Sequence, residues 1–147
     1  LLASFLGDKV ATILGAIQFM TVPGVGPITA LTFKAAVDDP SRFKKSRTVA
    51  AHSGLTPRRY QSGEHDNPGR ISKAGDRDVR ATLYAAANAL LMRTMASSQI
   101  KSWGMRLIRT KGRRRAVVAV ARKLAVLLHR MWIDGTEFRQ EQVGGKA

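Results

Sequence analysis

The sequence has 147 residues, 44% of them hydrophobic, which predicts one globular domain with a single core. Its 25 lysines and arginines against 10 acidic residues give a formal net charge of +15, which indicates a polyanionic partner such as nucleic acid. The lack of cysteine excludes disulfides and thiolate metal sites and fits a cytoplasmic protein. A membrane partner is disfavoured, because the longest apolar stretch, residues 116–133, is interrupted by Arg122 and Lys123.

The first segment, residues 1–20, is predicted to be a helix with one apolar stripe. The stripe either packs on the domain's own core or belongs to the end of a coiled connecting segment, which leaves oligomerisation open. Because the first residue is not Met, we expect a fragment or a processed product. The stripe residues recur at steps of three and four: Leu2, Leu6, Val10, Ile13, Ile17 and Met20.

A glycine-containing turn, Pro23 to Pro27, precedes a helix predicted over residues 28–37. Two helices joined in this way resemble a helix-hairpin-helix, in which backbone N–H groups at Gly24 and Gly26 would face a nucleic-acid phosphate. Such a contact reads the backbone of the nucleic acid and not its sequence. The alternative is a connecting turn that needs glycines only for its geometry.

A long basic segment from Gly54 to Gly75 follows a short helix predicted over residues 47–53. Loops of this length in compact domains are usually functional or disordered. Its middle is predicted to form a short β-hairpin, with strands at residues 60–62 and 70–72 around a turn at residues 64–69.

The C-terminal half is predicted to contain two long helices. The first runs from an N-cap at Asp76 to about residue 97, and the second covers residues 113–132, with a core face and a cationic face. Residues 100–112 between them are predicted to be a basic link, irregular or only briefly helical. This half lacks acidic residues between Asp78 and Asp134 while cations accumulate: Arg80, Arg93, Lys101, Arg106, Arg109, Lys111, Arg113, Arg114, Arg115 and Arg122. Of these cations, Arg113, Arg114, Arg115 and Arg122 are predicted to bind nucleic acid.

These elements predict a mainly α fold: a compact helical domain with the helix-hairpin-helix-like element and the basic loop. We expect three parts: a connecting helix over residues 1–20, a nucleic-acid-binding domain over residues 21–135, and a tail over residues 136–147.

Ser62 is the candidate nucleophile of the basic segment. Its hydroxyl could attack a phosphodiester while nearby cations stabilise the transition state, and Tyr60 could stack on a base. The alternative is an ordinary turn serine. The spacing of His52 and His65 demonstrates no base for Ser62, and His129 is predicted to be a surface or groove residue. The cations around Ser62 are Arg58, Arg59, Arg70 and Lys73.

The carboxylates are predicted to serve as helix caps and not as metal ligands. Asp38 and Asp39 close a helix before Pro40, and Asp76 and Asp78 begin one. Metal-dependent nuclease chemistry needs carboxylates that converge on Mg²⁺, so we expect no metal site or other cofactor in this chain.

Three strings in this order resemble a known family: Thr21-Val22-Pro23-Gly24-Val25-Gly26, Ser53-Gly54-Leu55-Thr56-Pro57-Arg58-Arg59-Tyr60-Gln61-Ser62-Gly63 and Ile71-Ser72-Lys73-Ala74-Gly75. They are similar to the C-terminal, transposase-20 type domain of insertion-sequence transposases of the 110/116/902 family, also called bridge-RNA-guided recombinases. The resemblance covers roughly residues 21–130.

The resemblance implies that Ser62 attacks DNA and forms a transient phosphoserine link. It implies DNA and a guide RNA as partners, held by cations around Ser62, and a homo-oligomer for the whole protein. Family members also carry a RuvC-like domain whose acidic residues bind metal, and the sequence holds no counterpart of it. We therefore expect Mg²⁺ only in that domain, and nucleic-acid binding with little or no strand exchange by this chain alone.

Two other functions remain compatible with the sequence. One is a non-catalytic module that holds DNA or structured RNA through the turn at Gly24 and the basic helices; the other is an RNA-binding structural protein of ribosomal type.

Overall fold

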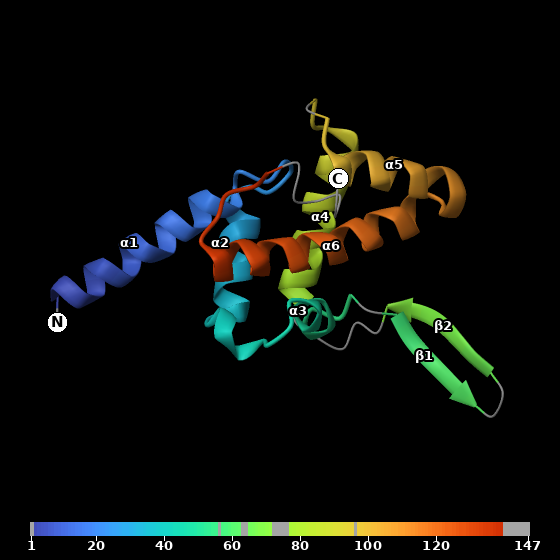
Figure 1. Cartoon of the computed structure of the whole chain (residues 1–147), viewed down its shortest axis with the longest axis horizontal. Coiled ribbons are helices and arrows are strands. Elements are labelled where there is room, and N and C mark those ends of the chain that lie inside the picture. The colour runs from blue at the N-terminus through green and yellow to red at the C-terminus, as the bar shows by residue number, and fades with distance from the viewer. Residues whose placement is uncertain (1, 56, 63–64, 72–76, 96, 140–147) are drawn as a thin grey trace.

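A computed structural model describes residues 2–55, 57–62, 65–71, 77–95 and 97–139, with the backbone alone in residues 57–62 and 65–71. The described residues are mainly helical, with one β-hairpin that extends from the helices (Figure 1). The elements in chain order are α1 (Leu2–Phe19), α2 (Pro27–Val37), the 3-10 helix η1 (Pro40–Arg42), α3 (Arg47–His52), β1 (Pro57–Ser62), β2 (His65–Ile71), α4 (Arg77–Met92), α5 (Gln99–Lys111) and α6 (Arg113–Asp134). The predicted mainly α class is confirmed.

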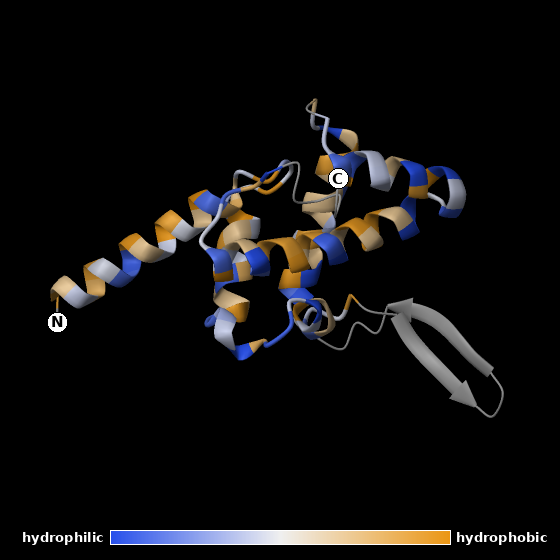
Figure 2. Cartoon of the chain, in the orientation of Figure 1, coloured by the Kyte–Doolittle hydropathy of each residue, from blue (hydrophilic) through white to orange (hydrophobic). Residues whose placement is uncertain are grey.

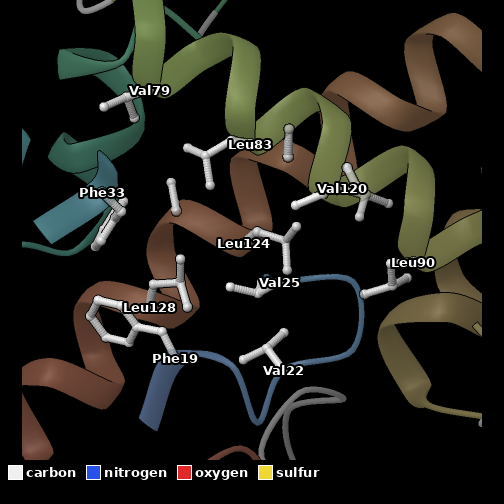
Figure 3. Packing of buried hydrophobic residues seen from close by; sticks show 14 of the residues in the cluster. Phe19, Val22, Val25, Phe33, Val79, Leu83, Leu90, Val120, Leu124 and Leu128 are labelled. Atoms are coloured by element: carbon white, nitrogen blue, oxygen red, sulfur yellow. The ribbon is translucent and has the colours of Figure 1, made fainter. Parts of the chain in front are cut away.

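The core forms where α4 and α6 cross. The apolar positions of α4 recur every three to four residues, and its Leu83 and Leu90 are fully buried together with Leu124 and Leu128 of α6 (Figure 3). α2 contributes Phe33 to the same cluster. Burying a large apolar side chain of this kind contributes about 1.5–3 kcal/mol to stability, so this crossing fixes the positions of the other elements.

α1 is mostly outside the core. Only its last turn is buried, where Phe19 packs edge-on against Phe33 at 5.5 Å and against Trp132 at 5.8 Å between ring centroids. The predicted stripe is exposed, because Leu2, Leu6, Val10, Ile13 and Ile17 are each more than half exposed to solvent. Figure 2 shows apolar residues along α1, where the helix extends away from the rest of the chain. Of the two alternatives for this stripe, packing on the domain's own core is therefore wrong for all but the last turn.

α1 is also the one helix in the described part of the chain with the length and composition of a membrane span. Its mean hydropathy is 1.2, and 11% of it is buried. It carries Asp8 and Lys9 near its middle. Helices with an apolar interaction face reach the same hydropathy, so this property alone does not identify a membrane protein.

α5 corrects the prediction of an irregular basic link over residues 100–112, because this segment is a regular helix from Gln99 to Lys111. Ser98 begins the helix by accepting a hydrogen bond from the Lys101 N–H at 3.2 Å. Gly104 packs so closely that an added Cβ would lie 2.5 Å from Leu91 Cδ2 and 2.9 Å from Val120 Cγ2. The absence of a side chain at Gly104 thus lets α5 approach α4 and α6 closely.

The boundaries of the other helices agree with the sequence to within a few residues, with one exception. α4 ends at Met92 and not near residue 97, and Thr94 Oγ1 then donates to the Leu90 carbonyl at 2.6 Å. The predicted cap Asp76 lies outside the described residues. The division into residues 1–20, 21–135 and 136–147 stays a prediction.

Candidate nucleic-acid interface

The hairpin that carries Ser62 is antiparallel, and its strands are longer than predicted. Residues 65–69, expected in a turn, belong to β2, because Ser62 pairs with His65 and Tyr60 with Asn67. The pairing is irregular between Pro57 and Arg59. Pro68 and Gly69 suggested a turn, but both strands of a two-stranded hairpin are edges, where proline and a bulge are tolerated.

Ser62 is the last residue of β1, at the end of the hairpin far from the helices. At about 3.3 Å per residue it lies about 17 Å along the strand from Pro57. The predicted phosphate ligands Arg58 and Arg59 and the stacking residue Tyr60 share β1, and Arg70 lies in β2. The fourth predicted cation, Lys73, lies outside the described residues.

The start of the hairpin is fixed by a helix C-cap. Gly54 has φ of +68°, its N–H donates to the Ala51 carbonyl, and the Leu55 N–H donates to the Ala50 carbonyl, both at 3.0 Å. This pair of bonds is a Schellman motif, which requires the left-handed conformation at Gly54. Leu55 is then fully buried two residues before Pro57.

Arg122 of α6 also holds the start of the hairpin in place, by binding the backbone of Leu55. Its Nε donates to the Leu55 carbonyl at 3.1 Å, and burial lowers the pKa of its guanidinium. The prediction that Arg122 binds nucleic acid stays a prediction. Its hydrogen bond to Leu55 is structural, because it ties the start of the hairpin to the core helix α6.

The turn between α1 and α2 is built on the core. The Val25 N–H donates to the Val22 carbonyl at 3.1 Å, and Gly24 has φ of +89°, the geometry of a type II turn with Pro23 at its second position. Val22 and Val25 are buried beside α4 and α6 (Figure 3). A Cβ on Gly24 would lie 2.6 Å from the Ala86 carbonyl oxygen and 2.9 Å from the Leu90 nitrogen. Gly24 is therefore required by packing on α4.

Gly26 is different from Gly24. It precedes α2 as its N-cap with an extended backbone, and a Cβ there would meet no atom within 4 Å. Its carbonyl accepts the Ala30 N–H at 3.0 Å, while Ile28 in the first turn is 74% exposed. Of the two glycines predicted to bind phosphate, only Gly26 has open space beside it.

The corner between α5 and α6 is strongly cationic, with exposed basic residues on both sides of Gly112. Arg113 is held by its Nη2, which donates to Asn88 Oδ1 of α4 at 2.8 Å. Lys123 stacks on the Trp103 ring at 3.9 Å, and burial, followed by the charge of Arg106, lowers the pKa of its amine. The exposed cations of this corner are Arg106, Arg109, Lys111, Arg113, Arg114 and Arg115.

The carboxylates Asp38 and Asp39 occur at a chain reversal between α2 and η1. Asp39 Oδ1 accepts the Ser41 N–H at 2.9 Å and the Ser41 hydroxyl at 2.7 Å, and these bonds lower the pKa of the carboxyl. Within the described residues, no group of three or more His, Cys, Asp or Glu side chains is placed to hold a metal ion. Asp76, another of the carboxylates considered in the sequence, lies outside the described residues.

His129 corrects the prediction of a surface or groove histidine, because it is 2% exposed. Its Nε2 lies 2.8 Å from the Pro40 carbonyl and its Nδ1 lies 2.7 Å from Ser46 Oγ. Since a carbonyl only accepts, Nε2 carries a proton. The sequence could not reveal the contact between His129 and Ser46, because these residues are 83 positions apart. The buried His129 ring thereby links α6 to Pro40 of η1 and to Ser46, which directly precedes α3.

Comparison with known proteins identifies the family. The sequence profile of the Transposase IS116/IS110/IS902 family matches residues 16–102, which include the turn at Gly24, the whole hairpin and α4. This match covers more than half of the 147 residues. The chain belongs to this transposase family.

Individual relatives agree with this assignment. The chain is 36% identical over 123 residues to a putative transposase of Sinorhizobium fredii, a match that covers 82% of this chain and 32% of the relative. It is 39% identical over 112 residues to the transposase of insertion sequence element IS1111A of Coxiella burnetii, covering 76% and 31%. A pilin gene-inverting protein of Moraxella bovis is 32% identical over 68 residues, covering 46% and 21%. The chain spans about a third of the length of the first two.

Proposed function

We propose that this chain is the serine-bearing part of a DNA transposase, which cuts and rejoins DNA through a covalent link to Ser62. The observation that carries the proposal is the family match over residues 16–102, which contains the hairpin that ends in Ser62. Relatives named as transposases and as a gene-inverting protein support DNA transposition and site-specific recombination as the general activity.

The chemistry follows from a hydroxyl and a phosphodiester. The Ser62 oxygen forms a bond to phosphorus, the bond from phosphorus to one deoxyribose oxygen breaks, and the leaving oxygen takes up a proton while serine loses one. A hydroxyl from a second DNA end then reverses the step, so the phosphodiester bond is conserved without an external energy source. Arg58, Arg59, Arg70 and Lys73 would stabilise the negative charge of the pentacoordinate transition state.

The whole transposase would supply what this chain lacks. We propose that a RuvC-like domain brings Mg²⁺ and completes the active site, that a guide RNA selects the target, and that the whole protein acts in the cytoplasm as a homo-oligomer. The position of Ser62 at the outer end of a hairpin supports a composite site, since another domain or subunit can reach it there. The exposed stripe of α1 offers an apolar face for assembly.

The test is a search for the covalent intermediate. The whole transposase that contains this sequence is incubated with guide RNA, target DNA and Mg²⁺, and the protein is analysed for a DNA adduct on Ser62. We expect an adduct in the parent protein, its loss in Ser62→Ala, and its retention in Ser102→Ala, a matched change at an exposed serine of α5. An active parent protein without an adduct, or an active Ser62→Ala variant, contradicts the proposal.

A second candidate function is a non-catalytic module that holds nucleic acid. The cationic corner of α5 and α6 favours it, because these exposed side chains lie on helices away from the hairpin (Figure 1). Binding through them should weaken with salt, with a log-log slope of about −0.9 per neutralised phosphate on duplex DNA. Recombination that survives Ser62→Ala with undiminished rate would favour this function over the first.

A further inference from the structure

Arg80 lies in the first turn of α4, directly after a residue that is fixed in the core. Its neighbour Val79 is 1% exposed, and the Thr82 carbonyl on the next turn faces the Thr29 hydroxyl of α2 at 3.5 Å. The backbone that carries Arg80 is therefore held by packing on both sides. The side chain itself is half-buried.

One guanidinium nitrogen of Arg80 lacks a partner. Within the described part of the chain, Arg80 Nη1 is shielded from solvent and makes no hydrogen bond. Buried polar atoms in native proteins are nearly always paired, and the exceptions call for a ligand, an ion or a function. A guanidinium is charged at every accessible pH and can only donate, so the missing partner must be an acceptor, and an anion fits best.

Three other arginines in this fold donate a guanidinium hydrogen bond to an acceptor within the chain. Arg42 Nη1 donates to the Val37 carbonyl at 2.8 Å, Arg113 Nη2 to Asn88 at 2.8 Å, and Arg122 Nε to the Leu55 carbonyl at 3.1 Å. Arg80 lies two residues after Asp78, near the start of a stretch, residues 79–133, that contains no acidic residue. An anion for Arg80 is therefore more readily supplied by a partner than by its own part of the chain.

Arg80 is also placed to act together with the hairpin. β2 ends at Ile71, and α4 begins six residues later at Arg77, so the chain that carries Ser62 leads directly into the helix that carries Arg80. The other strand starts beside Leu55, which Arg122 ties to α6. Both ends of the hairpin thus connect to a rigid helical base.

We propose that Arg80 binds a backbone phosphate of the DNA that the Ser62 hairpin engages, and that it acts as a positioning residue for that DNA. This inference rests on the proposed function. The phosphate is a different one from the phosphate that Ser62 attacks, because Ser62 lies at the end of β1 far from the helices, whereas Arg80 lies in α4 (Figure 1). A planar guanidinium with two donors on one phosphate fixes both position and orientation.

The experiment compares three variants of the 147-residue chain: Arg80→Met, which removes every side-chain donor, Arg80→Lys, which keeps the charge, and the control Arg93→Met at an exposed position directly after α4. Affinity for a DNA duplex and for an RNA duplex of equal length is measured over a range of salt concentrations, together with the melting temperature of each free variant. These readouts separate a ligand contact from a structural one.

We expect Arg80→Met to bind DNA about tenfold more weakly than Arg93→Met, with a salt slope smaller by about 0.9. Arg80→Lys should recover the slope and part of the affinity. The melting temperature of Arg80→Met should be unchanged or raised, because the free protein loses only an unpaired donor.

Equal DNA affinity of Arg80→Met and Arg93→Met overturns the inference, as does a loss confined to RNA. A lower melting temperature also overturns it, because the guanidinium would then have a partner within the fold. The adduct assay on Ser62 is independent of these measurements. If Ser62 forms no adduct while Arg80→Met still weakens DNA binding, the catalytic proposal fails and the phosphate contact stands.

Discussion

The turn at Gly24 and the hairpin that carries Ser62 look alike in the sequence, since both are glycine-containing segments between helices. In the structure, the turn is part of the core: Val22 and Val25 are buried, and Gly24 touches the backbone of α4. The hairpin extends from the helices and is held at its start by Gly54, Leu55 and Arg122. A glycine can therefore serve close packing in one segment and a chain reversal in another, and only the contacts reveal which.

The largest expected loss of stability comes from a substitution in the turn at Gly24. Gly24→Ala should lower stability by about 3–5 kcal/mol, because the new Cβ meets backbone atoms of α4 that cannot move aside and the residue must keep φ of +89°. Chemical denaturation measures this loss. A stability close to that of the parent chain would show that the turn is not packed on α4. The turn and the hairpin would then not differ in their packing on the core.

A smaller effect is expected at the start of the hairpin. Arg122→Gln should cost about 1–2 kcal/mol, because the Leu55 carbonyl loses a charged donor. In the whole transposase, we expect slower formation of the Ser62 adduct as well. The control is Arg130→Gln, an exposed change two turns further along α6. Equal stability of these two variants would mean that Arg122 does not hold the hairpin.

The smallest change in stability is expected at Gly26, which differs from Gly24 in having open space beside it. Gly26→Asn and Gly26→Asp both suit a helix N-cap with an extended backbone, so each should change stability by less than about 1 kcal/mol. If the start of α2 binds a nucleic-acid phosphate, Gly26→Asp should reduce DNA affinity about fivefold relative to Gly26→Asn, because only the aspartate repels the phosphate. Equal affinities of the two variants would leave the turn with a structural role alone.

Much of the helical fold could be predicted, because its signals are local. The apolar steps of α4 and α6 and the glycines after α3 and α6 are properties of neighbouring residues. α5 was predicted wrongly although its apolar residues Ile100, Trp103, Leu107 and Ile108 have helical spacing. The packing of Gly104 against Leu91 explains why a glycine occurs inside this helix.

The candidate site was less predictable, because it depends on contacts between distant segments. Ser62 and the cations of its hairpin were identified as candidates from the composition and the ordered motifs of the sequence, and their roles stay predictions. Arg80 was visible only as one cation among many, and its unpaired donor appears only when the surrounding chain is in place. The same is true of His129, whose partners Pro40 and Ser46 lie on another part of the chain.

The sequence by itself determined the charge, the mainly helical class and the order of motifs that identifies the family, because composition and local spacing require no folded structure. Tertiary structure decided the roles of individual residues. It separated Gly24 from Gly26 by what a Cβ would touch, gave Arg122 a structural contact, left a donor of Arg80 unpaired and kept the stripe of α1 exposed. Burial and hydrogen bonding depend on which distant segments meet, and no local pattern records that.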